Sequence, residues 1–66
     1  MIEQEIKWAN KLQQVLGDEY RVYYDICDSG LTEVWCGNVM VKRVLNSEMN
    51  GKINVNDFRL NLVGRR

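Results

Sequence analysis

The spacing of apolar residues in this sequence changes once, across residues 17–19. Before that segment they recur every three or four positions, and after it they alternate with polar residues. The first spacing is typical of one face of an α-helix, and the second is typical of a strand with one buried side. Because the spacing changes only once, the sequence predicts an α+β fold in which one helix precedes a sheet.

A helix is predicted over residues 2–16. Its apolar stripe consists of Ile2, Ile6, Ala9, Leu12 and Leu16. Polar side chains fill most of the positions between them, so the helix is amphipathic. Gly17 follows the last apolar residue, where a left-handed glycine commonly ends a helix. We therefore expect the helix to end at about Leu16.

Strands are predicted over residues 20–27, 31–36, 39–45 and 52–63, the last with a break near residues 56–57. Ser29-Gly30 and Gly37-Asn38 are interpreted as two-residue turns between the first three strands. Residues 39–49 also fit a helix, with Asn38 as its N-cap, and we prefer the strand. The predicted architecture is one domain over residues 1–66, with an N-terminal amphipathic helix packed on an antiparallel meander of three or four strands.

The two turns also predict which residues face each other. The expected pairs are Tyr24 with Trp35, Trp35 with Met40, Glu33 with Lys42, and Leu31 with Val44. In that register the helix packs on the side that holds Tyr20, Val22, Tyr24, Ile26, Leu31, Trp35, Met40 and Val44.

The opposite side of the predicted sheet is also rich in apolar residues. It holds Tyr23, Val34, Cys36, Val39 and Val41 beside polar residues such as Arg43. Contiguous apolar surface of several hundred Å² usually marks a contact. We expect the C-terminal segment to cover this side, which is the simpler explanation, or a partner to do so.

The residue types argue against catalysis and against a bound metal or cofactor. The sequence has no histidine, which is the usual general base and the usual partner of a nucleophilic cysteine. Its five glycines are isolated from one another, so they form no phosphate-binding loop. Cys27 and Cys36 are not spaced as a metal-binding pair, and each is interpreted as a small buried apolar residue. We expect no enzymatic activity, no metal and no cofactor.

Cysteine content and hydropathy indicate a cytoplasmic protein. Two cysteines are too few for the disulfide framework of a small secreted domain, and the first residues do not resemble a signal peptide. Apolar runs are shorter than the roughly 18 residues needed to cross a bilayer. We therefore expect no membrane association.

Charge is balanced overall and divided along the chain. Nine basic residues match nine acidic ones, with a net charge of −4 over residues 1–33 and +4 over residues 34–66. The basic half suggests a nucleic-acid-binding domain, which is our alternative hypothesis. The candidate contacts are Lys52, Arg59, Arg65 and Arg66. A nucleic-acid binder usually has a net basic balance, so the neutral total weighs against this alternative.

Our first hypothesis is a protein-interaction module. A chain of 66 residues has a thin core that usually needs a disulfide, a metal, oligomerisation or a partner as a supplement. The candidate contact residues are Tyr23, Val34, Val39, Val41 and Arg43. Small α+β proteins without recognisable motifs are common among accessory proteins of phages and mobile elements, so one form of this hypothesis is an inhibitor of a host enzyme or defence nuclease. A structural homodimer is the remaining alternative.

Overall fold

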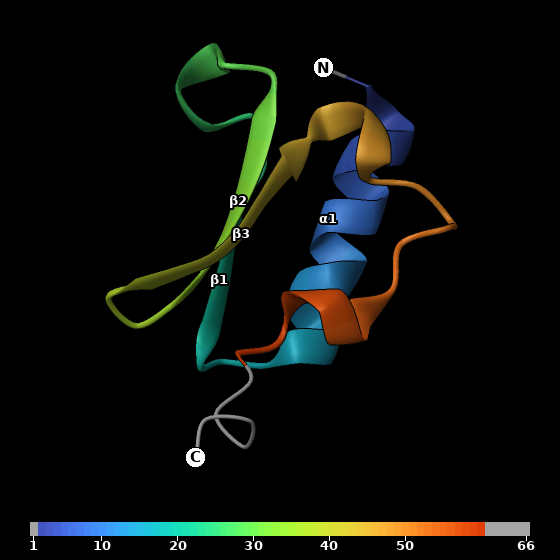
Figure 1. The fold of residues 1–66 in the computed structure, drawn as a ribbon. Helices are drawn as coiled ribbons and strands as arrows, with labels where there is room; N and C mark the ends of the chain where they lie inside the picture. Colours follow the sequence, from blue (N-terminus) through green and yellow to red (C-terminus); the bar gives the residue numbers. More distant parts are fainter. Residues whose placement is uncertain (1, 61–66) are drawn as a thin grey trace.

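The protein is a helix packed against a three-stranded antiparallel sheet, in a computed structural model that describes residues 2–60 (Figure 1). Helix α1 spans Glu3–Leu16, and strands β1, β2 and β3 span Tyr20–Tyr23, Leu31–Cys36 and Val39–Leu45. The sheet order is β1-β2-β3. Short 3-10 helices span Ile26–Asp28, Asn46–Glu48 and Val55–Phe58. The predicted α+β class is therefore confirmed, with three strands in the part of the chain that the structure describes.

Helix α1 ends where its sequence predicts. Gly17 follows Leu16 with a φ of 91°, a conformation that glycine adopts without steric cost, and its N–H donates to the carbonyl of Gln13. Three residues of the apolar stripe, Ala9, Leu12 and Leu16, are buried against the sheet. The chain then enters β1 at Tyr20 with the alternating pattern that favours a strand.

The hairpin of β2 and β3 has the predicted two-residue loop and an unpredicted bulge. Cys36 faces Val39 and Trp35 faces Met40, as a Gly37-Asn38 turn requires. Beyond that pair Val41 is an extra residue, so Val34 faces Lys42 and Glu33 faces Arg43. The predicted pairs of Glu33 with Lys42 and of Leu31 with Val44 are therefore wrong by one residue.

The connection of β1 to β2 is longer than predicted. The strand stops at Tyr23, and residues 24–30 form a loop in which Asp25, Cys27 and Asp28 have left-handed φ angles of 53°, 53° and 55°. The carboxylate of Asp25 accepts from the N–H of Gly30 at 2.9 Å and from the Asn46 amide at 3.0 Å. These bonds fold the loop back onto the start of β2, where a two-residue turn at Ser29-Gly30 was expected.

The longer loop turns β2 over relative to β1 in comparison with the predicted sheet. Trp35 faces Arg21 rather than Tyr24, which is a displacement of three residues. An odd displacement moves every side chain of a strand to the opposite side. Thr32 and Val34 therefore lie on the core side of the sheet with 0% of their surface exposed, and Trp35 lies on the opposite side.

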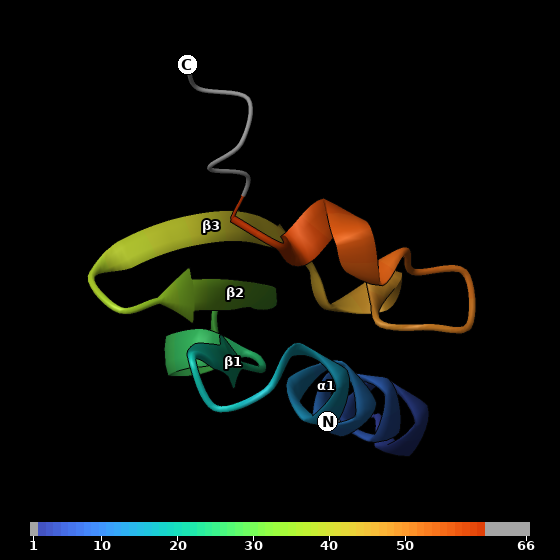
Figure 2. The same cartoon turned by 90° about the horizontal axis from the view of Figure 1, so that it is seen from below.

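The C-terminal segment packs beside α1 on the same side of the sheet (Figure 2). Met49 and Phe58 complete the core, with Ile53, Val55 and Leu60 packed against it. Residues 52–60 contain no strand, because Asn54 caps a 3-10 helix by accepting from the N–H of Asn56. The predicted strand over 52–63 is absent as far as residue 60, and residues 61–63 lie outside the described part.

Candidate functional site: the outer face of the sheet

The side of the sheet that faces away from α1 is here called the outer face. It carries Arg21 and Tyr23 from β1, Leu31, Glu33 and Trp35 from β2, and Met40, Arg43 and Leu45 from β3. Exposed fractions are 45% for Tyr23, 38% for Met40 and 57% for Leu45. Among residues 2–60, neither α1 nor the C-terminal segment covers this face (Figure 2).

Glu33 lies at the centre of the outer face and contacts Trp35 and Arg43 there. Its Oε1 accepts the indole N–H of Trp35 at 3.0 Å, and its Oε2 lies 3.8 Å from the guanidinium of Arg43. The Glu33 side chain keeps 14% of its surface exposed, compared with 51% for Arg43. The carboxylate therefore fixes the Trp35 ring on the face and holds the side chain of Arg43 at the edge.

A hollow of about 530 Å³ opens beside this cluster. Tyr23, Ile26 and Trp35 give it apolar walls, and Asp18, Glu19 and Arg21 lie at its rim. The Arg21 guanidinium donates to the backbone carbonyls of Asp18 and Tyr20, each at 3.3 Å, so it is held close to the end of β1. The outer face thus combines apolar side chains with the Glu33 carboxylate at its centre and with charged groups at its edges.

The free edge of β1 is blocked against strand addition. The side chain of Gln13 on α1 donates to the carbonyl of Tyr20 at 2.8 Å and accepts the N–H of Val22 at 2.9 Å. An amide thereby occupies the backbone groups that another strand would use.

The free edge of β3 is protected against strand addition by a bulge, by charged residues and by a side-chain hydrogen bond. The bulge at Val41 interrupts its regular spacing, Lys42 and Arg43 place charges on it, and the N–H of Leu45 donates to Glu48. Bulges and charged residues are devices by which sheet edges avoid pairing with other chains. Both edges of the sheet are therefore protected against strand addition.

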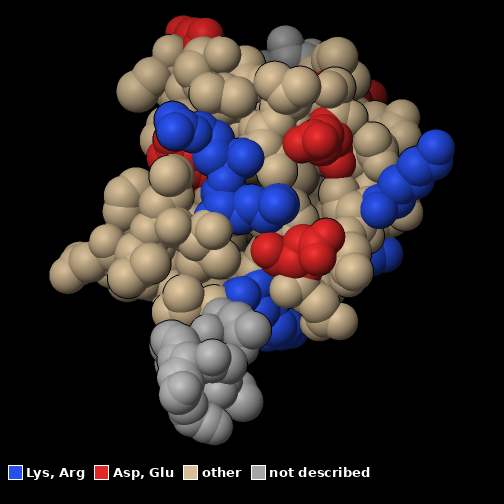
Figure 3. Space-filling view, viewed as in Figure 1, with Lys and Arg blue, Asp and Glu red and all other residues tan. Residues whose placement is uncertain are grey.

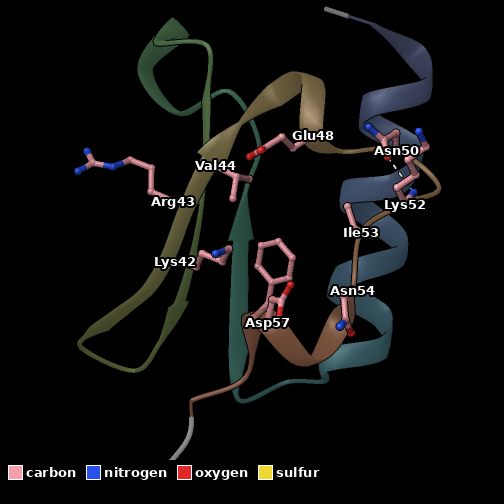
Figure 4. Close-up of a pocket in the computed structure, with 10 residues that line it drawn as sticks. Lys42, Arg43, Val44, Glu48, Asn50, Lys52, Ile53, Asn54 and Asp57 are labelled. Carbon is pink, nitrogen blue, oxygen red and sulfur yellow. Dashed lines mark hydrogen bonds between the residues drawn. The ribbon is translucent and has the colours of Figure 1, made fainter.

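A second cavity, of about 410 Å³, lies between β3 and residues 48–58 (Figure 4). Lys42, Arg43 and Lys52 line it together with Glu48 and Asp57. Lys42 reaches over the ring of buried Phe58, with Nζ 6.0 Å from the ring centroid. Basic and acidic side chains alternate over this side of the molecule, so no continuous basic patch forms there (Figure 3).

The structure separates the residues predicted as partner contacts. Tyr23 and Arg43 lie on the outer face, and Val34, predicted beside them, is fully buried on the side of α1. Val39 and Val41 were also placed on the wrong side: Val39 pairs with core-facing Cys36, and Val41 packs against the core.

The structure describes two of the four residues predicted to contact nucleic acid. Lys52 lines the cavity beside β3, and Arg59 donates to the carbonyl of Val15 from an exposed position. Arg65 and Arg66 lie outside the described residues.

Sequence reasoning placed half-buried Trp35 and exposed Met40 on the side of the helix because it assigned a strand up to residue 27, and it did not name exposed Leu45. Asp25 and Asp28 are residue types that strands disfavour and turns favour, and they were the signal for a longer loop. The interpretation of Cys27 as buried is wrong for the same reason: the thiol is exposed in that loop, while Cys36 is half-buried.

Within residues 2–60, no group of three or more cysteine and carboxylate side chains is arranged to hold a metal ion. No helix in the same range is both long enough and apolar enough to pass through a bilayer. Comparisons of the chain with protein-family models, with curated proteins and with solved structures find no match.

Proposed function

We propose that this protein is a non-enzymatic, cytoplasmic protein-interaction module that binds its partner through the outer face. The observation that carries the proposal is the unequal cover of the sheet. One side is buried under α1 and the C-terminal segment, and the other exposes Tyr23, Met40 and Leu45 around the fixed ring of Trp35. Clustered exposed aromatic and aliphatic side chains with charges at the rim are typical of protein contacts.

The two free thiols support the cytoplasmic assignment. Cys27 is exposed on the 24–30 loop and Cys36 is half-buried within β2, and neither forms a disulfide. An exposed free thiol is compatible with a reducing compartment.

Site-specific photo-crosslinking in cells tests the proposal. A photoreactive residue replaces Met40 on the outer face in one variant, and Val15 on the solvent side of α1 in the control. The two side chains are 38% and 48% exposed, so random collisions label both positions to a similar extent. We expect a discrete crosslinked protein from the Met40 position and only background from Val15.

Equal labelling at the two positions, or none at Met40, would count against the outer face. The identity of a captured protein also shows whether the module inhibits a host enzyme or defence nuclease, as the phage-type form of the hypothesis holds. Crosslinks to nucleic acid that fade with rising salt would favour the nucleic-acid alternative instead, because phosphate contacts release counterions.

A further inference from the structure

We propose that Asn50 is a site of spontaneous covalent modification, at which the side-chain amide is lost as ammonia and an aspartyl or isoaspartyl residue takes its place. The modification is independent of the proposed function and lies outside the outer face. Three features of the turn after the Asn46–Glu48 3-10 helix support it: the residue that follows Asn50, the hydrogen bonds of the Asn50 side chain, and the exposure of the turn to water.

The reaction is an attack by the next backbone nitrogen on the side-chain amide. Solvent removes the N–H proton of Gly51, and the nitrogen forms a bond with Cγ of Asn50. The bond from Cγ to Nδ2 then breaks, and Nδ2 takes up a proton from water and leaves as ammonia. Water opens the resulting succinimide ring at either of its carbonyl groups, which gives aspartate or isoaspartate. Either product places a carboxylate in the cavity that Lys42 and Lys52 line.

Gly51 is the residue that favours this attack. Asn50 and Gly51 form the one Asn-Gly pair in the sequence. Glycine has no Cβ, so its nitrogen approaches a neighbouring side chain with less steric hindrance than that of any other residue. Gly51 is also exposed, and within the part of the chain that the structure describes its N–H donates no hydrogen bond. The attacking nitrogen is therefore accessible to solvent.

The side chain of Asn50 is folded back over the same backbone. Its Oδ1 accepts the N–H of Lys52 at 2.8 Å, which closes a turn around Gly51 (Figure 4). The same N–H stabilises the negative charge that develops on Oδ1 when the nitrogen attacks Cγ. Nδ2, the leaving group, donates to the carbonyl of exposed Ser47 at 2.9 Å. These hydrogen bonds hold the amide beside the attacking nitrogen.

Asn54 provides a control within the same chain. Its Oδ1 accepts the N–H of Asn56 at 3.1 Å, so its side chain forms the same kind of turn as that of Asn50. Asn54 is exposed and Asn50 is half-buried, so access of water does not favour Asn50. The residue after Asn54 is Val55, whose branched side chain hinders the attack. A comparison of the two asparagines therefore isolates the effect of glycine.

Incubation of the purified whole chain in warm, mildly alkaline buffer tests the proposal. Mass spectrometry of its peptides measures the conversion of each asparagine, and an isoaspartyl-specific methyltransferase labels the isoaspartyl product. We expect Asn50 to convert in the folded protein at least about tenfold faster than Asn54, because only Asn50 precedes glycine. A second sample, unfolded in urea under otherwise equal conditions, shows the rate without the fold.

Gly51→Ala is the matched variant. The φ of Gly51 is not left-handed, and a Cβ at this position would lie 3.5 Å from the ring of Trp8, which is an ordinary van der Waals contact. We therefore expect the variant to fold, as circular dichroism can check. Conversion of Asn50 should fall at least about tenfold in it, because the added Cβ hinders the attack.

Three outcomes would overturn the proposal, and each leaves the outer face unaffected. Conversion of Asn50 in urea but not in the folded protein would show that the fold protects the amide. Equal rates at Asn50 and Asn54 would show that the turn does not single out Asn50, and this comparison needs no variant to fold. An unchanged rate in folded Gly51→Ala would show that glycine is not the cause.

Discussion

Gln13 joins α1 to the edge of β1 through both ends of its side-chain amide. Its nitrogen donates to the carbonyls of Gly17 and Tyr20, and its oxygen accepts the N–H of Val22. Strand β1 is an edge strand, with β2 on one side only, and Gln13 forms hydrogen bonds with backbone groups on its free edge. A backbone N–H or C=O group that is buried without a hydrogen-bond partner destabilises the folded state.

Gln13→Met should lower the free energy of unfolding by about 1–3 kcal/mol, because it keeps the shape of the side chain and removes its hydrogen bonds. Urea denaturation followed by circular dichroism measures the change. The control is Gln14→Met, at the next and exposed position of α1, where we expect little effect. Equal losses for the two variants would contradict the role given to Gln13.

Tyr24 links the end of β1 to the start of α1. Its hydroxyl donates to a carboxylate oxygen of Glu5 at 2.7 Å. This hydrogen bond, with some contribution from desolvation, raises the pKa of Tyr24 above the usual tyrosine value of 10.0. The neutral phenol is therefore favoured in the folded protein.

The raised pKa predicts that stability declines at alkaline pH. The contribution of Tyr24 is fully present below the unfolded pKa of about 10 and is lost as the pH rises through the higher folded value. Denaturant titrations between pH 8 and pH 11.5 measure it. Tyr24→Phe should reduce the alkaline decline, and Tyr23→Phe, which removes an outer-face hydroxyl, should retain it. An unchanged decline in Tyr24→Phe would assign the effect to other groups.

Among the elements, β2 is the central strand of the sheet, with one side in the core and the other on the outer face. Thr32 and Val34 face the core, and Glu33 and Trp35 face outward. The buried hydroxyl of Thr32 donates to the side-chain oxygen of Asn46, whose amide nitrogen donates in turn to Asp25. This chain of bonds connects the 24–30 loop to the residue that follows β3, so it holds the register of the whole sheet.

Alanine substitutions on the two sides of the sheet test that register. Val34→Ala should lower the free energy of unfolding by about 2 kcal/mol, because Val34 is fully buried. Met40→Ala should stay within about 0.5 kcal/mol of the parent, because Met40 is exposed on the outer face. A larger loss of unfolding free energy for Met40→Ala than for Val34→Ala would contradict this register and support the one predicted from the sequence.

The 24–30 loop is the element with the most unusual backbone. Cys27 adopts φ 53° and ψ 35°, a left-handed conformation that is strained for residues other than glycine. Cys27→Gly should therefore raise the free energy of unfolding by roughly 1 kcal/mol. Thermal and urea melts provide the measurement. Ser29→Gly, at a right-handed position of the same loop, should give no such gain, and a loss of stability in Cys27→Gly would contradict the conformation of the loop.

The molecule as a whole has one core and one uncovered sheet face. The buried residues come from α1, from all three strands and from the C-terminal segment, so they form one continuous cluster. Within residues 2–60, α1 and the C-terminal segment pack on one side of the sheet, and neither packs on the other (Figure 2). A partner bound to the outer face, as proposed above, would cover the second side of the sheet.

A partner of different sequence implies that the isolated protein is a monomer. Its melting temperature should then be unchanged over about a hundredfold dilution, because only self-association makes melting depend on protein concentration. Light scattering at the highest concentration checks the mass directly. A melting temperature that falls on dilution would favour the structural homodimer.

The sequence by itself predicted the order of α1 and the three strands, but not the 3-10 helix that replaces the expected fourth strand. The change of apolar spacing at Gly17 placed α1, and Gly37-Asn38 placed the β2–β3 turn with its Trp35–Met40 pair. These features depend on residues close together in the chain, where backbone preferences and side-chain periodicity act directly. They also established the α+β class.

Only the tertiary structure decided which side of the sheet is buried. That choice depends on a loop length set by hydrogen bonds between Asp25 and Asn46, which lie 21 positions apart, and on one bulge residue at Val41. A strand has a period of two, so displacement by an odd number of residues turns a core residue into a surface residue without changing the local pattern. For that reason only Tyr23, of the apolar residues predicted for the second face, lies on the outer face, and the fold decided that Trp35, Met40 and Leu45 lie there and that Val34 does not.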